Sequence, residues 1–113
     1  MTIFRKIDDI VGKPTSHGVG LKKVLLANNE CASNITQIAL TTLDAGSVVE
    51  EHVHFDMEEY FLVQSGEVLI TIEGEEHKLA GGDFIYIPYG KSHQLKVIAT
   101  TTMLTIGCEI RNT

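Results

Sequence analysis

The sequence lacks the long hydrophobic runs that mark membrane-spanning helices, since no apolar stretch approaches the roughly 20 residues that a span requires. Its first residues, Met-Thr-Ile-Phe-Arg-Lys-Ile-Asp-Asp, carry charges where a signal peptide would have its apolar region. The hydrophobic fraction of 43% nevertheless suits a chain with a packed core. We therefore expect one folded domain over residues 1–113, outside the membrane and in the cytoplasm.

Basic residues are also scarce. The chain has nine Lys and Arg against 15 Asp and Glu, which gives a net charge of -6, and its basic residues form no cluster larger than the adjacent pairs Arg5-Lys6 and Lys22-Lys23. A nucleic-acid partner is not expected, because the phosphate backbone requires a positive surface. Between Val24 and Gly90 the only basic residue is Lys78, which weighs against phosphosugar substrates.

Cysteine is limited to Cys31 and Cys108, which are far apart and form no Cys-x-x-Cys pair. Free thiols in a reducing cytosol are the expected state, with a disulfide or a reactive thiol as the alternative.

Helical patterns are missing as well, and short strand-like runs fill most of the chain. Residues 18–26 resemble an edge strand, whereas residues 3–11 fit either a strand or a short helical turn. The turns at 65–66 and 73–75 suggest hairpins. This spacing predicts an all-β antiparallel sandwich or barrel, with further strands at 34–43, 60–64, 67–72, 84–87, 94–98 and 101–106.

The most informative pattern is a pair of histidines separated by one residue. His52 and His54 alternate, so in an extended segment both imidazoles project from one face. Glu59 begins the next strand-like run and can bring a carboxylate to that face, and His93 adds a third imidazole. Three imidazoles and a carboxylate suit one divalent transition metal, with zinc, nickel, manganese and iron all open. The sequence therefore predicts a small metal-binding protein.

The spacing of these residues resembles the first motif of the cupin superfamily. That motif has a glycine, five residues, His-x-His, three or four residues, glutamate, six residues and glycine. The matching positions, which cover 46–66 with four residues before the glutamate, are Gly46, His52, His54, Glu59 and Gly66.

The second cupin motif is also similar. It has a glycine, five residues, Pro-x-Gly, two residues, histidine, three residues and asparagine. Over residues 82–97, Val97 stands at the asparagine position, which lies outside the metal shell in the family pattern; the matching residues are Gly82, Pro88, Gly90 and His93.

The resemblance implies a small single-domain monocupin with a jelly-roll β-barrel, also called a double-stranded β-helix. It implies that one divalent metal is bound by His52, His54, Glu59 and His93. It further implies a homodimer, which such a barrel could form by pairing its outer strands.

Glu58 competes with Glu59 for the carboxylate role. The six-residue spacing to Gly66 favours Glu59, as does the strand face that Glu59 would share with Phe61 and Val63.

Other residues are open to two interpretations. Gln37 is polar in an apolar run, so it either faces the cavity or points outward. Phe61 and Tyr86, with Met57, could line the pocket mouth, although such residues are usually core. His17 and His77 match no motif and are expected to be solvated.

Four protein ligands would leave one or two metal positions for a small-molecule ligand or substrate. The first hypothesis is an isomerase, epimerase or lyase acting on a small oxygen-rich substrate such as a sugar or keto acid. The sequence does not identify a catalytic base for it. The alternatives are an Fe(II)-dependent dioxygenase and a non-catalytic binding or sensor module.

Overall fold

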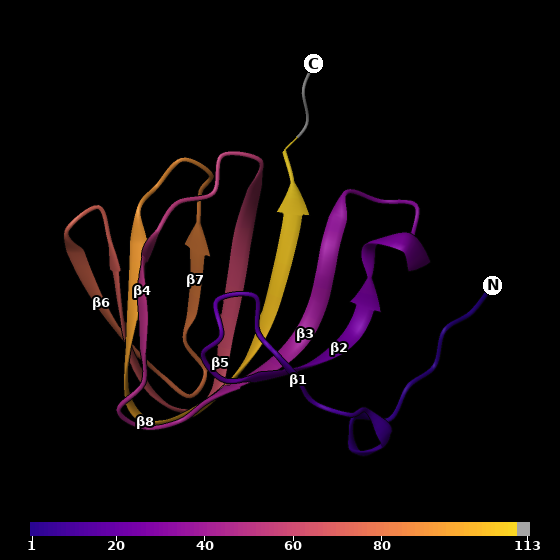
Figure 1. The fold of residues 1–113 in the computed structure, drawn as a ribbon, viewed down its shortest axis with the longest axis horizontal. Coiled ribbons are helices and arrows are strands. Elements are labelled where there is room, and N and C mark those ends of the chain that lie inside the picture. The colour runs from indigo at the N-terminus through magenta and orange to yellow at the C-terminus, as the bar shows by residue number, and fades with distance from the viewer. Residues whose placement is uncertain (111–113) are drawn as a thin grey trace.

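The computed structural model describes residues 1–110, and these residues form an open β-barrel (Figure 1). The only helical segments in this described part are two short 3-10 turns, η1 (Ile7–Asp9) and η2 (Asn28–Glu30). None of its helices is long or apolar enough to cross a membrane. The strands are β1 (Lys13–Pro14), β2 (Leu21–Ala27), β3 (Ile35–Leu43), β4 (Val48–His52), β5 (Met57–Ile72), β6 (Glu75–Ala80), β7 (Phe84–Ile87) and β8 (His93–Glu109).

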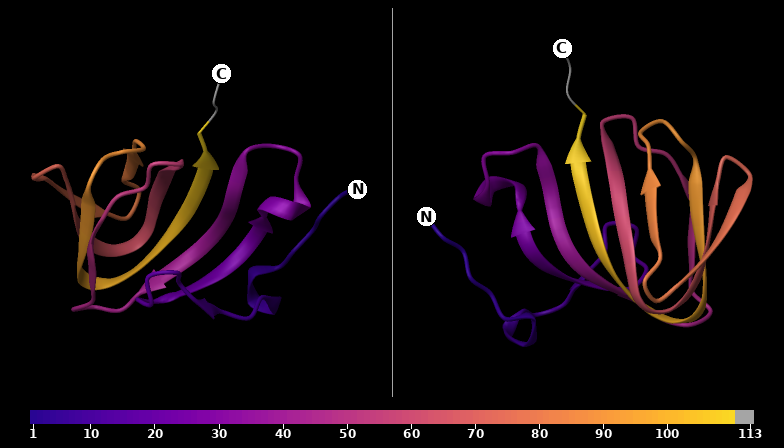
Figure 2. Two further views of the ribbon diagram at one scale, coloured as in Figure 1. Left: turned by 45° about the horizontal axis from the view of Figure 1, so that its top comes forward. Right: turned by 180° about the vertical axis from the view of Figure 1, so that it is seen from behind.

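The long strands β5 and β8 form the frame of the barrel, because both of its halves share them. The first half of β5 pairs with β7 and the second half with β6, while β8 runs antiparallel beside both. β4 pairs with the beginning of β8 and β3 with its end. The sheet therefore curls around an interior, with β1, β2 and β3 forming one wall (Figures 1 and 2). This architecture confirms the all-β prediction.

The turn expected at residues 65–66 is a bend rather than a hairpin. β5 continues through it, and the pairing of β5 with β8 shifts register there. Gly66 makes the bend possible because its φ is +98°, and a Cβ at this position would lie 2.2 Å from the Thr100 carbonyl oxygen. The buried Thr101 hydroxyl accepts a hydrogen bond from the Glu67 N–H. The sequence-based division of β8 into two strands at 94–98 and 101–106 is wrong for a similar reason, since β8 also runs unbroken.

The other expected hairpin is confirmed. β5 and β6 are joined through Glu73 and Gly74, both with positive φ, and Ile72 pairs with Glu75. At the N-terminus, η1 gives the short helical turn that was one of the two alternatives for residues 3–11.

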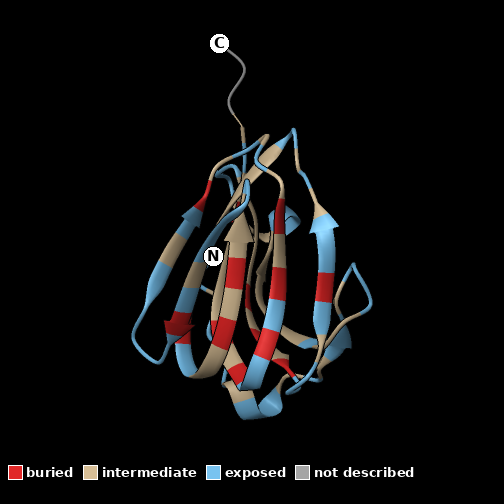
Figure 3. Ribbon diagram, turned by 90° about the vertical axis from the view of Figure 1, so that its left-hand side faces the viewer, coloured by how far each residue is buried: buried red, intermediate tan, exposed pale blue. Residues whose placement is uncertain are grey.

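The core occupies the inside of the barrel, where buried and exposed residues alternate along the strands (Figure 3). Val63, Val68 and Ile70 of β5 are fully buried. Val97, at the motif's asparagine position, is 4% exposed and packs in this core. Its backbone N–H and carbonyl bond to Ser47 and Gly46, so the valine side chain serves packing and its backbone secures the loop before β4.

Candidate metal centre

Four side chains from three strands and one loop converge at one end of the barrel interior. His52 ends β4, His54 follows in the loop, Glu59 lies on β5 and His93 begins β8. One nitrogen or carboxylate oxygen from each lies within 4.8 Å of all the others. Ligands on opposite sides of a transition metal, each at about 2.1 Å, would be about 4.2 Å apart. Because 4.8 Å exceeds this largest separation by about 0.6 Å, the four atoms would have to move closer together to bind one ion.

The backbone explains this convergence. His52 and His93 are paired residues on β4 and β8, and their ring centroids lie 4.2 Å apart. The Gly90 N–H donates a 2.6 Å hydrogen bond to the His54 carbonyl, which joins the loop after β4 to the loop before β8. Gly90 has a φ of +74°, a conformation that glycine adopts without strain. The two sequence motifs thus meet through a backbone contact.

Backbone carbonyls set the tautomers of two imidazoles. His52 Nδ1 lies 2.8 Å from the Glu50 carbonyl oxygen, and His93 Nδ1 lies 3.0 Å from that of Lys91. A carbonyl can only accept, so each Nδ1 carries the proton and each Nε2 keeps its lone pair. Metal-binding histidines are oriented by the same kind of second hydrogen bond.

His93 Nε2 is a buried polar atom without a hydrogen-bond partner in the described structure. The side chain is 2% exposed, and the nearest opposite charge is Glu59 Oε1 at 3.4 Å. A buried polar group without a partner costs about 1–3 kcal/mol. A metal ion at this point would supply the missing partner, so the residues present fit a metal.

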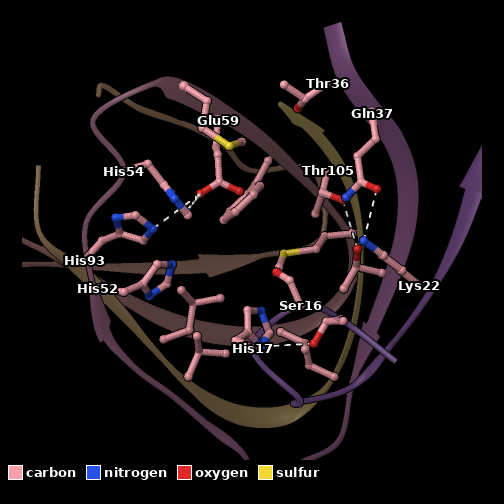
Figure 4. Close-up of a pocket in the computed structure, with 18 residues that line it drawn as sticks. Ser16, His17, Lys22, Thr36, Gln37, His52, His54, Glu59, His93 and Thr105 are labelled. Carbon is pink, nitrogen blue, oxygen red and sulfur yellow. Dashed lines mark hydrogen bonds and ion pairs between the residues drawn. The ribbon is translucent and has the colours of Figure 1, made fainter. Parts of the chain in front are cut away.

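Glu59 is the electrostatic centre of the cluster. Its Oε1 lies 3.3 Å from His54 Nε2 and 3.4 Å from His93 Nε2 (dashed lines, Figure 4). Burial opposes protonation of His93, but the Glu59 carboxylate, which would attract a protonated ring, and the Lys91 carbonyl outweigh it and raise the pKa of His93. The pKa of His52 is lowered, chiefly by burial and also by the neighbouring imidazoles.

Glu58 points away from this cluster, to the outer face of the barrel. Its carboxylate accepts hydrogen bonds from the hydroxyls of Tyr60 and Tyr86. The bond from Tyr60, with some burial, raises the pKa of Tyr60 to about 12. Alternation along β5 therefore separates the two glutamates: Glu59 faces the interior and Glu58 faces outward.

The expectation that Tyr86 lines the pocket is wrong. It lies opposite Tyr60 in the β5–β7 pairing, and the two rings stack with centroids 5.4 Å apart on the outer face. The reason is strand alternation: Ile87, next to Tyr86, points into the core, so Tyr86 points outward.

A cavity of about 490 Å³ adjoins the four side chains, a size that suits a small-molecule ligand. Gln37, Phe61 and Met57 line it, so Gln37 faces inward and Phe61 serves both core and cavity wall. Thr36, Thr105 and Lys22 lie on the wall away from His52, His54 and His93, and in this view Ser16 and His17 lie between the two groups (Figure 4).

His17 is exposed, as expected from the sequence, but it also lines the cavity, which sequence reasoning missed. The loop between β1 and β2 carries it into the cavity, 6.2 Å from His52 between ring centroids. His17 Nδ1 lies 3.0 Å from Thr15 Oγ1 and 3.3 Å from the Val19 backbone nitrogen, and these two contacts orient the ring. Burial, and then the His52 charge, lower the pKa of His17. No local motif marks this residue, because only the packing of the loop places it. His77, by contrast, lies on β6 outside the cavity.

The family model of the cupin domain matches residues 39–107, more than half of the chain. The chain therefore belongs to the cupin family, and its barrel is the jelly roll of that family. The sequence is 31% identical over 80 residues to a quercetin 2,3-dioxygenase of Bacillus subtilis, covering 71% of this chain. The chain spans only 24% of that relative's length.

Solved structures share the fold over nearly the whole chain. A predicted oxalate decarboxylase from Thermotoga maritima has a TM-score of 0.85 at 19% identity, with 96% of this chain and 100% of that chain covered. KdgF from Halomonas sp. has a TM-score of 0.81 at 16% identity, with coverages of 99% and 96%. At these identities the likeness establishes the fold alone.

Proposed function

We propose that this cupin binds one divalent transition-metal ion through His52, His54, Glu59 and His93. The observation that carries the proposal is the buried, unpartnered Nε2 of His93, which faces two imidazoles and a carboxylate. Zinc, nickel, manganese and iron all accept this donor set. The carboxylate also offsets one of the two positive charges of such an ion.

We further propose that the cavity holds a small oxygen-rich substrate and that the protein is an isomerase, epimerase or lyase. When bound, the metal would polarise a carbonyl or hydroxyl oxygen. His17 supports this function because its imidazole lines the same cavity and carries a ring N–H that can donate a hydrogen bond. It would stabilise negative charge that develops on a substrate oxygen. The apolar side chains of Phe61, Leu95 and Met103 would exclude water from the inner wall.

A second candidate is an Fe(II)-dependent dioxygenase. The 31% identity to a quercetin 2,3-dioxygenase favours it, although the match covers a quarter of that protein. Activity restricted to iron, with consumption of O₂, would select this candidate. A protein that binds small acids or sugars at the metal but converts none of them would be a sensor or binding module.

Elemental analysis tests the metal proposal directly. We expect about one metal per chain in the wild type, a large loss in His52→Ala, and no loss in the matched control His77→Ala, which lies outside the cavity. Equal, substoichiometric metal in all three proteins would refute the assignment. The dominant element then determines whether aerobic or anaerobic substrate screens follow.

We also propose a homodimer, formed through the outer face of β3, β8, β5 and β7 rather than through edge strands. Apolar side chains continue across this face, with Leu62 39% and Phe84 60% exposed. Such a surface suits a symmetric contact between two copies. The outer-face residues are Ile38, Leu40, Tyr60, Leu62, Phe84, Tyr86, Leu104 and Ile106.

Sedimentation equilibrium tests the dimer. Phe84→Asp should give a monomer, whereas Ile98→Asp, at an exposed position on the other half of β8, should leave the mass unchanged. A wild type that is monomeric at all concentrations would refute the proposal. We propose in addition that residues 1–113 form a single domain and that the protein is cytoplasmic. The one sheet that links all eight strands supports the single domain, and the free thiols of Cys31 and Cys108 are consistent with a reducing compartment.

A further inference from the structure

Lys22 is a cationic side chain on the cavity wall opposite the histidines (Figure 4). It lies on β2, half-buried, and its Nζ donates a 3.0 Å hydrogen bond to Gln37 Oε1 on β3. Apart from the four proposed ligands and His17, it is the only titratable group among the residues that line this described cavity. The metal proposal gives Lys22 no role.

Lys22 has no carboxylate beside it; other described lysines, such as Lys96, share this, but of the described lysines only Lys22 lines the cavity. Lys78 pairs with Glu67 at 2.7 Å, and Arg5 pairs with Glu30. Within residues 1–110, no Asp or Glu oxygen lies within ion-pairing distance of Lys22. A partly buried charge is costly unless an opposite charge or strong hydrogen bonds compensate it. The neutral amide of Gln37 compensates the charge of Lys22 only in part.

The groups around Lys22 suit an anion. Gln37 Oε1 accepts from Lys22, so the N–H groups of the same amide are left to donate. The hydroxyls of Thr36 and Ser16 line the same cavity. A single lysine with neutral donors matches a carboxylate, whereas a phosphate dianion usually meets several cations.

We infer that Lys22 and Gln37 form the binding subsite for a carboxylate at the end of the substrate remote from the metal. The inference rests on the proposed function, because it takes the other end of the substrate to be an oxygen pair held at the four-ligand centre. A divalent ion with the Glu59 carboxylate would carry one positive charge, and Lys22 carries another. The substrate class is then a small keto or hydroxy dicarboxylate rather than a neutral sugar.

The overall charge of the protein makes this local cation necessary. A net charge of -6 repels a dianionic ligand at long range. At the cavity wall, a charge-assisted hydrogen bond from Lys22 can overcome that repulsion. Removing Lys22 should therefore weaken binding of a dicarboxylate far more than binding of a monocarboxylate of the same length.

Calorimetry with two matched acids tests the inference. The probes are 2-oxoglutarate and 2-oxopentanoate, which share a five-carbon chain and differ in the distal carboxylate. Metal-loaded wild type should bind the dicarboxylate at least tenfold more tightly. Lys22→Met should abolish this preference, Lys22→Arg should restore most of it, and Lys78→Met, at a surface ion pair, should leave it intact. Melting temperatures establish that each variant is folded.

Two outcomes overturn the inference: equal affinity of the wild type for the two acids, including no binding of either, and a preference that survives in Lys22→Met. Metal content is measured on the same samples, so a failure of the metal proposal is seen separately. If the wild type holds no metal, the titrations are repeated on the metal-free protein. The dicarboxylate preference must then still appear and still depend on Lys22, and its absence there also overturns the inference.

Discussion

Replacing His93 with leucine distinguishes a structural imidazole from a metal ligand. Leucine has a similar size, so it fills the site without the buried, unpartnered Nε2. Removing that atom should raise the free energy of unfolding by about 1–3 kcal/mol. The lost hydrogen bond to the Lys91 carbonyl should lower it by about 0.5–1.5 kcal/mol. The attraction to Glu59 is lost as well. We therefore expect the free energy of unfolding of the metal-free variant to lie within about 1 kcal/mol of wild type, or above it.

With metal present the order should reverse. A ligand at 100 times its Kd stabilises the folded state by about 2.7 kcal/mol. Wild type would gain this increment in full, whereas His93→Leu, with three ligands left, would gain much less. The metal-loaded wild type should then exceed the variant by roughly 2 kcal/mol.

Urea unfolding at pH 8, with a chelator or with added Zn²⁺, measures both differences. This pH lies about 1.5 units above the ordinary imidazole pKa of about 6.5, so protons compete less with the metal than at neutral pH. His77→Leu is the control, because its side chain lies outside the cavity and should respond equally in both conditions. A metal-free His93→Leu that loses more than about 3 kcal/mol would mean that the imidazole stabilises the core by itself, and the ligand interpretation would lose its main support.

Three further predictions follow from neighbouring features. Glu59→Gln should lower metal affinity at least tenfold in a chelator competition assay, while Glu58→Gln, on the outer face, should not change it; equal losses would refute the separation of the two carboxylates. Metal retention should fall as the pH drops toward 6.5 and below, because protons compete for His93 and its raised pKa starts this competition earlier than in a free histidine; full retention at pH 5 after dialysis would contradict imidazole ligation. In the metal-free protein, low pH should have the opposite effect on stability. The raised pKa of His93 means that its protonation stabilises the fold below about pH 6.5, and this contribution is lost as the pH rises through the folded-state pKa. Gly66→Ala should destabilise by at least about 2 kcal/mol in thermal or urea unfolding, because its Cβ meets backbone, whereas Gly74→Ala, in open space at a similar φ, should cost about 1 kcal/mol; equal costs would argue against the tight bend.

Strand alternation and motif spacing explain why the proposed ligands could be selected from the sequence. His52 and His54 are two residues apart, and Glu59 shares a strand face with Phe61, so local geometry alone indicates their common direction. The motif glycines point to the backbone positions with positive φ at Gly82 and Gly90, where the chain turns toward His93. The family and the all-β class follow from the same short-range pattern.

Only the tertiary structure decided the features that depend on how distant segments pack. Ser65-Gly66 has the composition of a hairpin turn, but pairing with β8 on both sides keeps β5 continuous and turns the glycine into a bend. Alternation places Tyr86 and Ile87 on opposite faces of β7, but only the pairing of Tyr86 with the outward-facing Tyr60 decides which of the two faces outward.

Lys22 and His17 have no motif, and they meet the cavity because β2 and the loop before it close one wall of the barrel. Side-chain direction along one strand is a local property that the sequence encodes within a few residues. Which residues line a cavity depends on contacts between segments far apart in the chain, and only the folded barrel specifies those contacts.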